Sequence, residues 1–486
     1  MLTQHNHRRV TALITRILSP FQYVPGISRA AAGAAVLAGA LAFAPTPAQA
    51  QTLAEALIAA YSNNPTLAAR RARLRATDEQ MPQALSNWRP SVAITGSTGK
   101  EYNSSTLRAS GFGGRSQNRT PQTLGVSVTQ PLFRGGRTVA ATEEAEHAVR
   151  AERARLIDTE QDILLSAATA YLNVFRDEAV LALNINNEKV LKRQLEATKD
   201  RFEVGEITRT DVHQAEARLA GATADRIRAE ANLENSRATY ENVVGLPAPR
   251  NLELPGDPGG LPKDRLDAIK LAATTNPNVI AAEFDRKAGQ KAVREVKGEL
   301  LPEVDVTASF DRAFETSSDR GISNSADIRL NLTVPIYQQG AVYSRLREAK
   351  QSLAELTRNI DQARRDAIED ATSAWENLQT ARARVVSFSA QIEANVVALD
   401  GVEREAAVGS RTVLDVLDAE QELLDSRVGH TEAQRDERVA AFELAAAVGK
   451  MTAMDMKLAV DVYDPRNHYN EVRGKWVGGS SSEEGK

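Results

Sequence analysis

Two aspartates, Asp415 and Asp418, lie three residues apart in the largely apolar stretch VGSRTVLDVLDA. Residues three apart are neighbours on a helix surface, so both carboxylates would share one face. Carboxylates held together attract cations, whereas one carboxylate at a helix start can accept hydrogen bonds from free backbone N–H groups. Thr412-x-x-Asp415 has the spacing of a capping box, which leaves both roles open for Asp415. Asp418 lies one turn further on, out of reach of a cap, and we expect another role for it. Both aspartates lie off the expected packing seam, which consists of Leu414, Leu417, Gln421 and Leu424.

Other residue types that could do chemistry are scattered along the chain. The 6 histidines do not cluster and no cysteine is present, so we expect no metal site, no disulfide and no cofactor. No nucleophile with an activating base can be identified, and we predict that the protein is not an enzyme. The chain carries 60 basic and 64 acidic residues, and its first 50 residues hold four of the basic ones and none of the acidic. Without them the balance is 56 − 64 = −8, which gives nucleic acid no basic footprint.

Residues 1–50 have the pattern of a secretory signal peptide. Basic residues precede the apolar run AAAGAAVLAGALAFA, and Ala48-Gln49-Ala50 follows as a small-x-small cleavage pattern. No later stretch has the roughly 18 consecutive apolar residues of a membrane-spanning helix. An exported chain of this kind is free in the periplasm, secreted, or held in the outer membrane by strands.

The rest of the chain contains the same pattern twice. Asn64-Pro65 matches Asn276-Pro277, while Val204-Gly205 matches Val408-Gly409 and Asp211 matches Asp415. Asp418 has no such counterpart, because its matching position is Gln214. We predict a first repeat at 51–245, a proline- and glycine-rich connector at 246–263, a second repeat at 264–449 and a partly disordered tail at 450–486.

Each repeat predicts the same order of elements. A helical segment (52–88, then 264–300) leads to two short strands, a very long helix (137–203, then 341–407) and a further helix (208–245, then 412–449). The second long helix carries a heptad seam, whose members are Leu346, Ala349, Leu353, Leu356, Ile360, Ala363 and Ala367. A helix of this length is a rod of roughly 100 Å, far longer than a globular domain needs.

The short segments alternate in polarity, as half-exposed strands do. Residues 124–128, 304–310 and 328–334 place apolar and polar side chains on opposite faces. Four strands cannot enclose a lumen, because about eight are needed even for a filled barrel. We therefore expect several copies of the chain to pool their strands.

These features resemble the TolC family of outer-membrane efflux channels. The resemblance rests on the Asn-Pro pairs, the strand-to-helix junctions TQPLFRGG and TVPIYQQG, and the turns in which Val-Gly-x-x-Thr precedes Asp. It implies a mainly helical fold with a small β part. Three identical chains would form a periplasmic α-barrel and, with four strands each, a 12-stranded outer-membrane β-barrel embedded in lipid. It also implies a passive exit duct for drugs, small molecules or secreted proteins, supplied by an inner-membrane pump or ABC exporter through a periplasmic adaptor.

The same resemblance assigns roles to the two helix turns. Asp415 and Asp418 would form acidic rings at the narrow periplasmic tip, and crowding of like charges would raise their pKa values. Arg411, with Thr210 and Asp211, would hold the tip closed, although Ala406 stands where the family prototype has a tyrosine. The turn residues expected to dock the adaptor are Val204, Gly205, Thr208, Val408, Gly409 and Thr412.

One alternative lies outside this family. A periplasmic adaptor-like or purely structural coiled-coil protein would also contain long heptad helices, and would have no pore. The duplication and the four alternating strands argue against it.

Overall fold

A computed structural model describes residues 52–480, except 106–114, 250–251 and 317–320. The expected signal peptide at 1–50 lies outside the described residues, as do the last six residues of the tail. None of the described helices is both long and apolar enough to cross a membrane.

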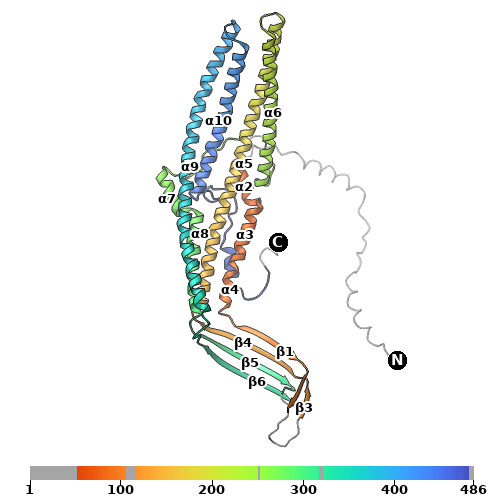
Figure 1. Ribbon diagram of the computed structural model, residues 1–486, viewed down its shortest axis with the longest axis vertical. Helices are drawn as coiled ribbons and strands as arrows, with labels where there is room; N and C mark the ends of the chain where they lie inside the picture. The colour runs from red at the N-terminus through yellow and green to blue at the C-terminus, as the bar shows by residue number, and fades with distance from the viewer. Residues whose placement is uncertain (1–51, 106–114, 250–251, 317–320, 481–486) are drawn as a thin grey trace, which may run out of the picture. The chain divides into compact units, whose positions relative to one another are not determined.

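The two halves of the chain share one order of elements, except that the first half has two additional strands and a helix break (Figure 1). The first half contains α2 (Leu53–Asn63), α3 (Pro65–Asp78), α4 (Gln80–Ser86), β1 (Ser91–Thr98), β2 (Glu101–Ser105), β3 (Arg115–Arg119), β4 (Gln122–Arg134), α5 (Arg137–Glu203) and α6 (Arg209–Val244). The second contains α7 (Arg265–Thr275), α8 (Pro277–Gly298), β5 (Glu303–Phe314), β6 (Ile322–Thr333), α9 (Ala341–Ala407) and α10 (Val413–Ala447). A short helix, α11 (Asn467–Val472), lies in the tail. The prediction of a mainly helical chain with a small β part is confirmed.

The four predicted strands form one antiparallel sheet in the order β1-β4-β5-β6. The register places Val128 opposite Ala308 and Ala308 opposite Ile328, so the apolar side chains share one face. Within the described residues, β1 and β6 are paired on one side only. Between β1 and β4 the first half has a polar insertion, which the second half lacks, and its ends pair as the hairpin β2–β3. β2 follows β1 and β3 precedes β4, so the pairing of β1 with β4 holds the two arms side by side.

The long helices carry the packing. α5 lies along α3, α4, α6 and α8, while α9 lies along α7, α8 and α10, and α10 also contacts α5. All members of the heptad seam in α9 are half-buried or buried, and every residue between them is exposed, which confirms the seam. Leu353 and Leu356 of this seam lie over Gly289 of α8, where an added Cβ would come within 2.6 Å of Leu356.

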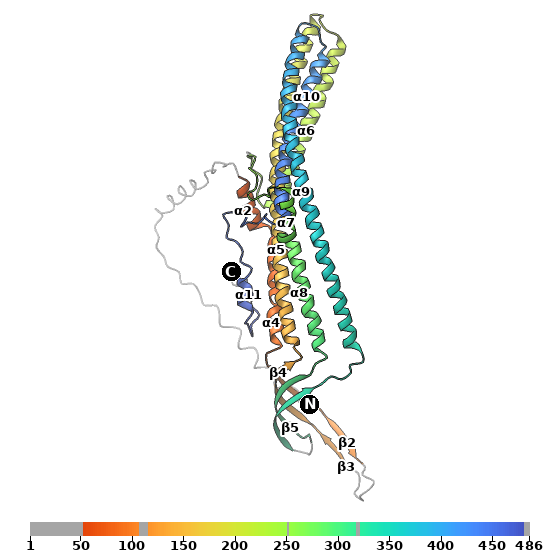
Figure 2. The same ribbon diagram turned by 90° about the vertical axis from the view of Figure 1, so that its left-hand side faces the viewer.

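The two Asn-Pro pairs join short helices end to end. Asn64 accepts a hydrogen bond from Thr66 N (2.9 Å) as the cap of α3, and its Nδ2 donates to Val243 O (3.0 Å) at the end of α6. Asn276 accepts from Asn278 N (2.9 Å) as the cap of α8, and its Nδ2 donates to Ala447 O (3.3 Å) at the end of α10. The following proline suits the first helical position, where its missing N–H is not needed. Figures 1 and 2 show the sheet at one end of the helices and the α5–α6 and α9–α10 turns at the other.

Candidate functional site at the helix turns

The turns α5–α6 and α9–α10 each expose a Val-Gly pair at their tips. Gly205 and Gly409 have φ values of 81° and 79°, a conformation that glycine adopts without a side-chain clash. No atom would lie within 4 Å of a Cβ added at either glycine. Val204 and Val408 beside them are 72% and 81% exposed. Each turn therefore presents one apolar side chain on a surface that the chain itself leaves uncovered.

Both turns start the next helix with a capping box. The Asp211 carboxylate accepts from Thr208 N (2.8 Å) and Thr208 Oγ1 (2.7 Å). The Asp415 carboxylate accepts from Thr412 N (2.8 Å), and Asp415 N donates to Thr412 Oγ1 (3.2 Å). The hydrogen bonds from the Thr412 backbone and hydroxyl hold the pKa of Asp415 below its usual value, with a smaller contribution from Arg411. Within one chain, the capping role open to Asp415 is therefore filled.

Asp418 takes part in a different contact. Its carboxylate forms an ion pair with the guanidinium of Arg218, which lies on α6 of the first repeat. Both side chains are well exposed, at 54% and 40%. The sequence analysis did not identify Arg218. The repeat nevertheless contains a signal, because Arg218 matches Glu422 and Asp418 matches Gln214. Both partners of the ion pair therefore lie at positions where the two repeats differ in charge.

The proposed closing residues are not brought together in one chain. Among the described contacts, Arg411 pairs with Glu405 of its own turn, its Nε lying 2.9 Å from the carboxylate. Asp211 is used as the cap of α6, and Thr210 is exposed in the first turn of the same helix. Ala406 is buried in the last turn of α9. A link between Arg411 and the first-repeat turn stays a prediction for an assembled form.

The packing seam expected for α10 was partly wrong. Leu414 is 36% exposed, while Leu417 is 2% exposed. The buried residues of this segment are Val413, Val416, Leu417 and Leu423. The reason is that α10 packs against two helices, α9 and α5, so its buried face is wider than a seam against one partner.

A half-buried carboxyl, that of Glu420, lies two residues after Asp418 on α10. Burial of Glu420 raises its pKa to about 7, and the charge of Glu403 on α9 adds to this shift. Its repeat counterpart Glu216 is in the opposite situation, because Lys199 (3.2 Å) and His213 (3.2 Å) lower its pKa. The two glutamates occupy equivalent positions in the repeats, and nothing in the sequence indicates that their pKa values shift in opposite directions.

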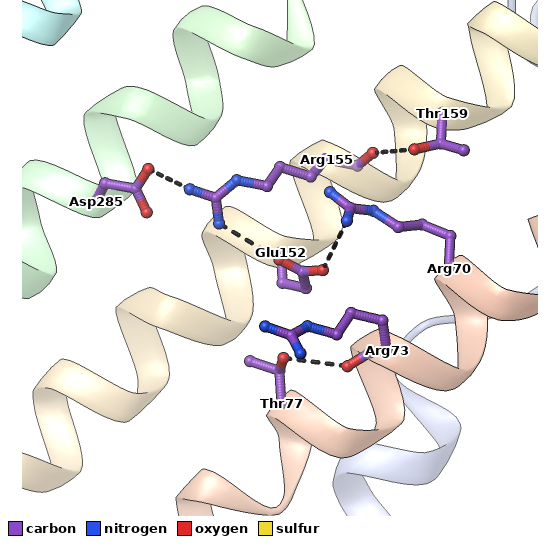
Figure 3. A network of polar contacts seen from close by, with 7 residues as sticks. All are labelled: Arg70, Arg73, Thr77, Glu152, Arg155, Thr159 and Asp285. Atoms are coloured by element: carbon purple, nitrogen blue, oxygen red, sulfur yellow. Dashed lines mark hydrogen bonds and ion pairs between the residues drawn. The ribbon is translucent and has the colours of Figure 1, made fainter.

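A polar network fixes α5 between α3 and α8 (Figure 3). Glu152 of α5 is 7% exposed and pairs with Arg70 of α3 (3.5 Å) and with Arg155 (3.3 Å). Arg155 also pairs with Asp285 of α8. Since α8 is the second-repeat counterpart of α3, α5 is held between two equivalent helices. In the described part of α9, only one such neighbour, α8, is present.

No group of three or more His, Asp or Glu residues within the described ranges is arranged to hold a metal ion. The sites described above therefore consist of helix caps, ion pairs and uncovered turn residues.

Comparison with known proteins gives consistent matches over nearly the whole chain. A family model described as outer membrane efflux protein matches residues 56–246 and 268–450. The outer membrane efflux protein BepC of Brucella suis is 35% identical over 446 residues, which cover 92% of this chain and 95% of BepC. The outer membrane protein TolC of Escherichia coli is 25% identical over 422 residues and 84% of each chain. The CmeC outer membrane channel of Campylobacter jejuni has a similar fold, with a TM-score of 0.73 at 15% identity, over 87% of this chain and 89% of CmeC.

Proposed function

The chain belongs to the outer membrane efflux protein family, and on that premise we propose that three copies of it join into one duct. It is a channel protein of the outer membrane, an exit duct for efflux or secretion, and not an enzyme. In the proposed assembly the helices form the periplasmic part of the wall, and the four strands of each copy close into a single sheet of twelve in the membrane.

The unpartnered side of α9 and the two free strand edges carry this proposal. α5 is flanked by α3 and by its equivalent α8, whereas, of these two helices, the described part of α9 contacts α8 alone. A second copy would supply its α3 to α9, and the same contact would bring its β1 edge toward β6. In the proposed assembly, the contact of α9 with α3 of the next copy would be equivalent to the contact of α5 with α3 within one copy.

The two faces of the sheet suit lipid on one side and water on the other. On β6, Ile328, Leu330 and Leu332 are 80%, 67% and 65% exposed, although apolar. The opposite face carries hydrogen-bonded polar side chains, including Asn331 Nδ2 to Asp305 (2.8 Å). In a membrane barrel, apolar residues face lipid and polar residues face the lumen.

The acidic tip would serve as a cation-attracting constriction. Asp415 and Asp418 of three copies would surround the axis, where a ring of carboxylates favours cations over anions. Arg218 partly neutralises Asp418 in each copy. The link from Arg411 to Thr210 and Asp211 would form in the closed assembly, in place of the Arg411–Glu405 pair of the single chain.

The uncovered turns would dock a periplasmic adaptor, which connects the duct to an inner-membrane pump or ABC exporter. Val204 with Gly205 and Val408 with Gly409 offer apolar contact and backbone access. Thr208 and Thr412 hold the adjoining helix starts in place through their capping boxes.

Reconstitution of the purified protein into a planar bilayer tests this function. We expect stable, cation-selective conductance, and a mass in detergent equal to three chains. Asp418→Asn should lower the preference for cations and Arg218→Ala should raise it, because the variant leaves the carboxylate unpaired. Asp461→Asn, the same chemical change at an exposed position in the tail, is the matched control.

Absence of conductance from pure oligomers would contradict the duct and favour the adaptor-like or structural coiled-coil alternative. If conductance is present but Asp418→Asn and Asp461→Asn have the same selectivity, the acidic constriction is wrong and the duct stands.

A further inference from the structure

The C-terminal segment ends beside the point where the helices give way to the sheet. α11 lies alongside α4 in Figure 2. The segment that follows α11 contacts Arg89, which stands two residues before the start of β1. Arg89 Nη1 donates to Lys475 O (2.7 Å), and the Arg89 guanidinium lies 4.8 Å from the ring centroid of Trp476. These contacts place Trp476 at the helix–strand junction.

Contacts made by α11 hold the C-terminal segment in place. In α11, His468 Nδ1 lies 3.2 Å from the fully buried carboxylate of Asp78, and Val472 is 3% exposed. Arg153 of α5 stacks on Tyr469, with 5.1 Å from its guanidinium carbon to the ring centroid. The segment is thus fastened to α3 and α5 before it reaches the junction.

Despite these contacts, the end of the segment exposes its largest apolar side chains. Trp476 is 65% exposed and Val477 is 86% exposed. Trp88, also at the junction, is 46% exposed, so two of the 3 tryptophans of the chain lie uncovered at this level. Phe133, at the same end of β4, is 48% exposed. Exposed aromatic side chains of the tail, of the segment before β1 and of β4 therefore all occur at the helix–strand junction.

Basic residues accompany these aromatic rings. Arg89 stacks on Trp476, and Arg473 and Lys475 precede it in the same segment. Tryptophan is enriched at membrane–water interfaces, where its ring is apolar and its N–H is polar. Lysine and arginine cover apolar surface with their stems while their charges stay among the headgroups.

We propose that residues 473–477 are a membrane-interface anchor, in which Trp476 and Val477 enter the headgroup region of the periplasmic leaflet of the outer membrane. The proposal rests on the function above, which places the sheet in that membrane. The anchor connects the lipid surface to α3 and α5 through α11. Each copy of the chain thereby holds the membrane at a second place outside its strands.

Tryptophan fluorescence in vesicles tests the anchor. The full-length protein and Trp476→Phe are reconstituted into phosphatidylcholine vesicles, with and without bromine on the acyl chains near the headgroups. The emission of Trp476 is the difference between the two proteins. We expect it to lie at short wavelength and to lose most of its intensity in brominated lipid. Trp375→Phe gives the control difference, because Trp375 is half-buried against the core beside α7 and should not be quenched.

Two results would overturn the anchor. Long-wavelength emission unaffected by bromine would mean that Trp476 stays in water. Short-wavelength emission unaffected by bromine would mean that a second copy covers it, with Ile336 and Tyr337 (89% and 75% exposed) as the available surface. Conductance measured on the same wild-type protein tests the duct separately. If the anchor alone is wrong, conductance remains; if the duct is wrong, conductance is absent.

Discussion

Removal of the Asn276 side chain should loosen the joint between α10 and α8. Asn276 is 8% exposed and makes two kinds of bond, as the cap of α8 and as the donor to the Ala447 carbonyl of α10. Loss of an N-cap costs about 1 kcal/mol, and loss of a partner for a buried carbonyl costs about 1 kcal/mol more. Asn276→Ala should therefore lower the free energy of local opening by about 2 kcal/mol, which corresponds to an exchange rate about 30-fold higher.

Hydrogen exchange of the intact oligomer, measured by mass spectrometry, detects this change without global unfolding. The expected increase is confined to peptides from the last turn of α10 and the first turn of α8. Asn276→Ser separates the two contributions, because serine can cap the helix but cannot reach the Ala447 carbonyl. It should show about half of the free-energy loss of the alanine variant.

The same peptides of the first repeat, around Asn64 and Val243, provide an internal reference and should exchange as in the wild type. The reasoning is refuted if Asn276→Ala exchanges like the wild type at both turns. It is also refuted in part if the serine variant equals the wild type, because the bond to α10 would then contribute nothing.

Two further changes test the tip. Thr412→Ala removes the hydroxyl of the capping box and should destabilise the start of α10 by about 1 kcal/mol, seen as faster exchange there and not at α6; equal exchange at both helix starts would contradict the cap. Glu420→Gln tests the half-buried carboxyl, whose pKa of about 7 in the folded chain exceeds its unfolded value. Folding favours the protonated form of Glu420. Its contribution to the free energy of unfolding is therefore fully present at low pH and is lost as the pH rises through about 7. The variant should therefore resist limited proteolysis of the tip better than the wild type at pH 8 and equally well at pH 4. The measurement is the ratio of the wild-type cleavage rate to the variant cleavage rate at each pH. An equal ratio at both pH values would mean that Glu420 is solvated.

The architecture could be predicted because its signals are repeated and local. The heptad seam of α9, the alternation in β6 and the Asn-Pro pairs each depend on spacing within a few residues. Pairing of β4 with β5 joins the two repeats, and here the sequence indicated only that strands exist. The hairpin β2–β3 escaped notice because EYNSS and RSQNR are too polar to show alternation.

The tip was harder to predict than the frame, because its contacts cross between repeats. The caps at Thr208 and Thr412 follow from a three-residue spacing and could be expected. The ion pair of Asp418 with Arg218 joins residues 200 positions apart, which no periodicity connects. The burial of Glu420 depends on α10 packing against α5 as well as α9, and the same feature turned Leu414 outward.

Each half of the chain contains an Asn-Pro joint, whereas the two halves differ at the tip. The hydrogen bonds from the side-chain amides of Asn64 and Asn276 are present in both halves, and each fastens a short helix to the end of a longer one. At the tip the halves differ: Lys199 and His213 lower the pKa of Glu216, whereas burial raises that of Glu420, and VGEIT in the first half stands against VGSRT, with the opposite charge, in the second. Comparison of the two halves within one chain therefore separates the contacts that hold helices end to end, which agree, from the charges at the tip, which differ.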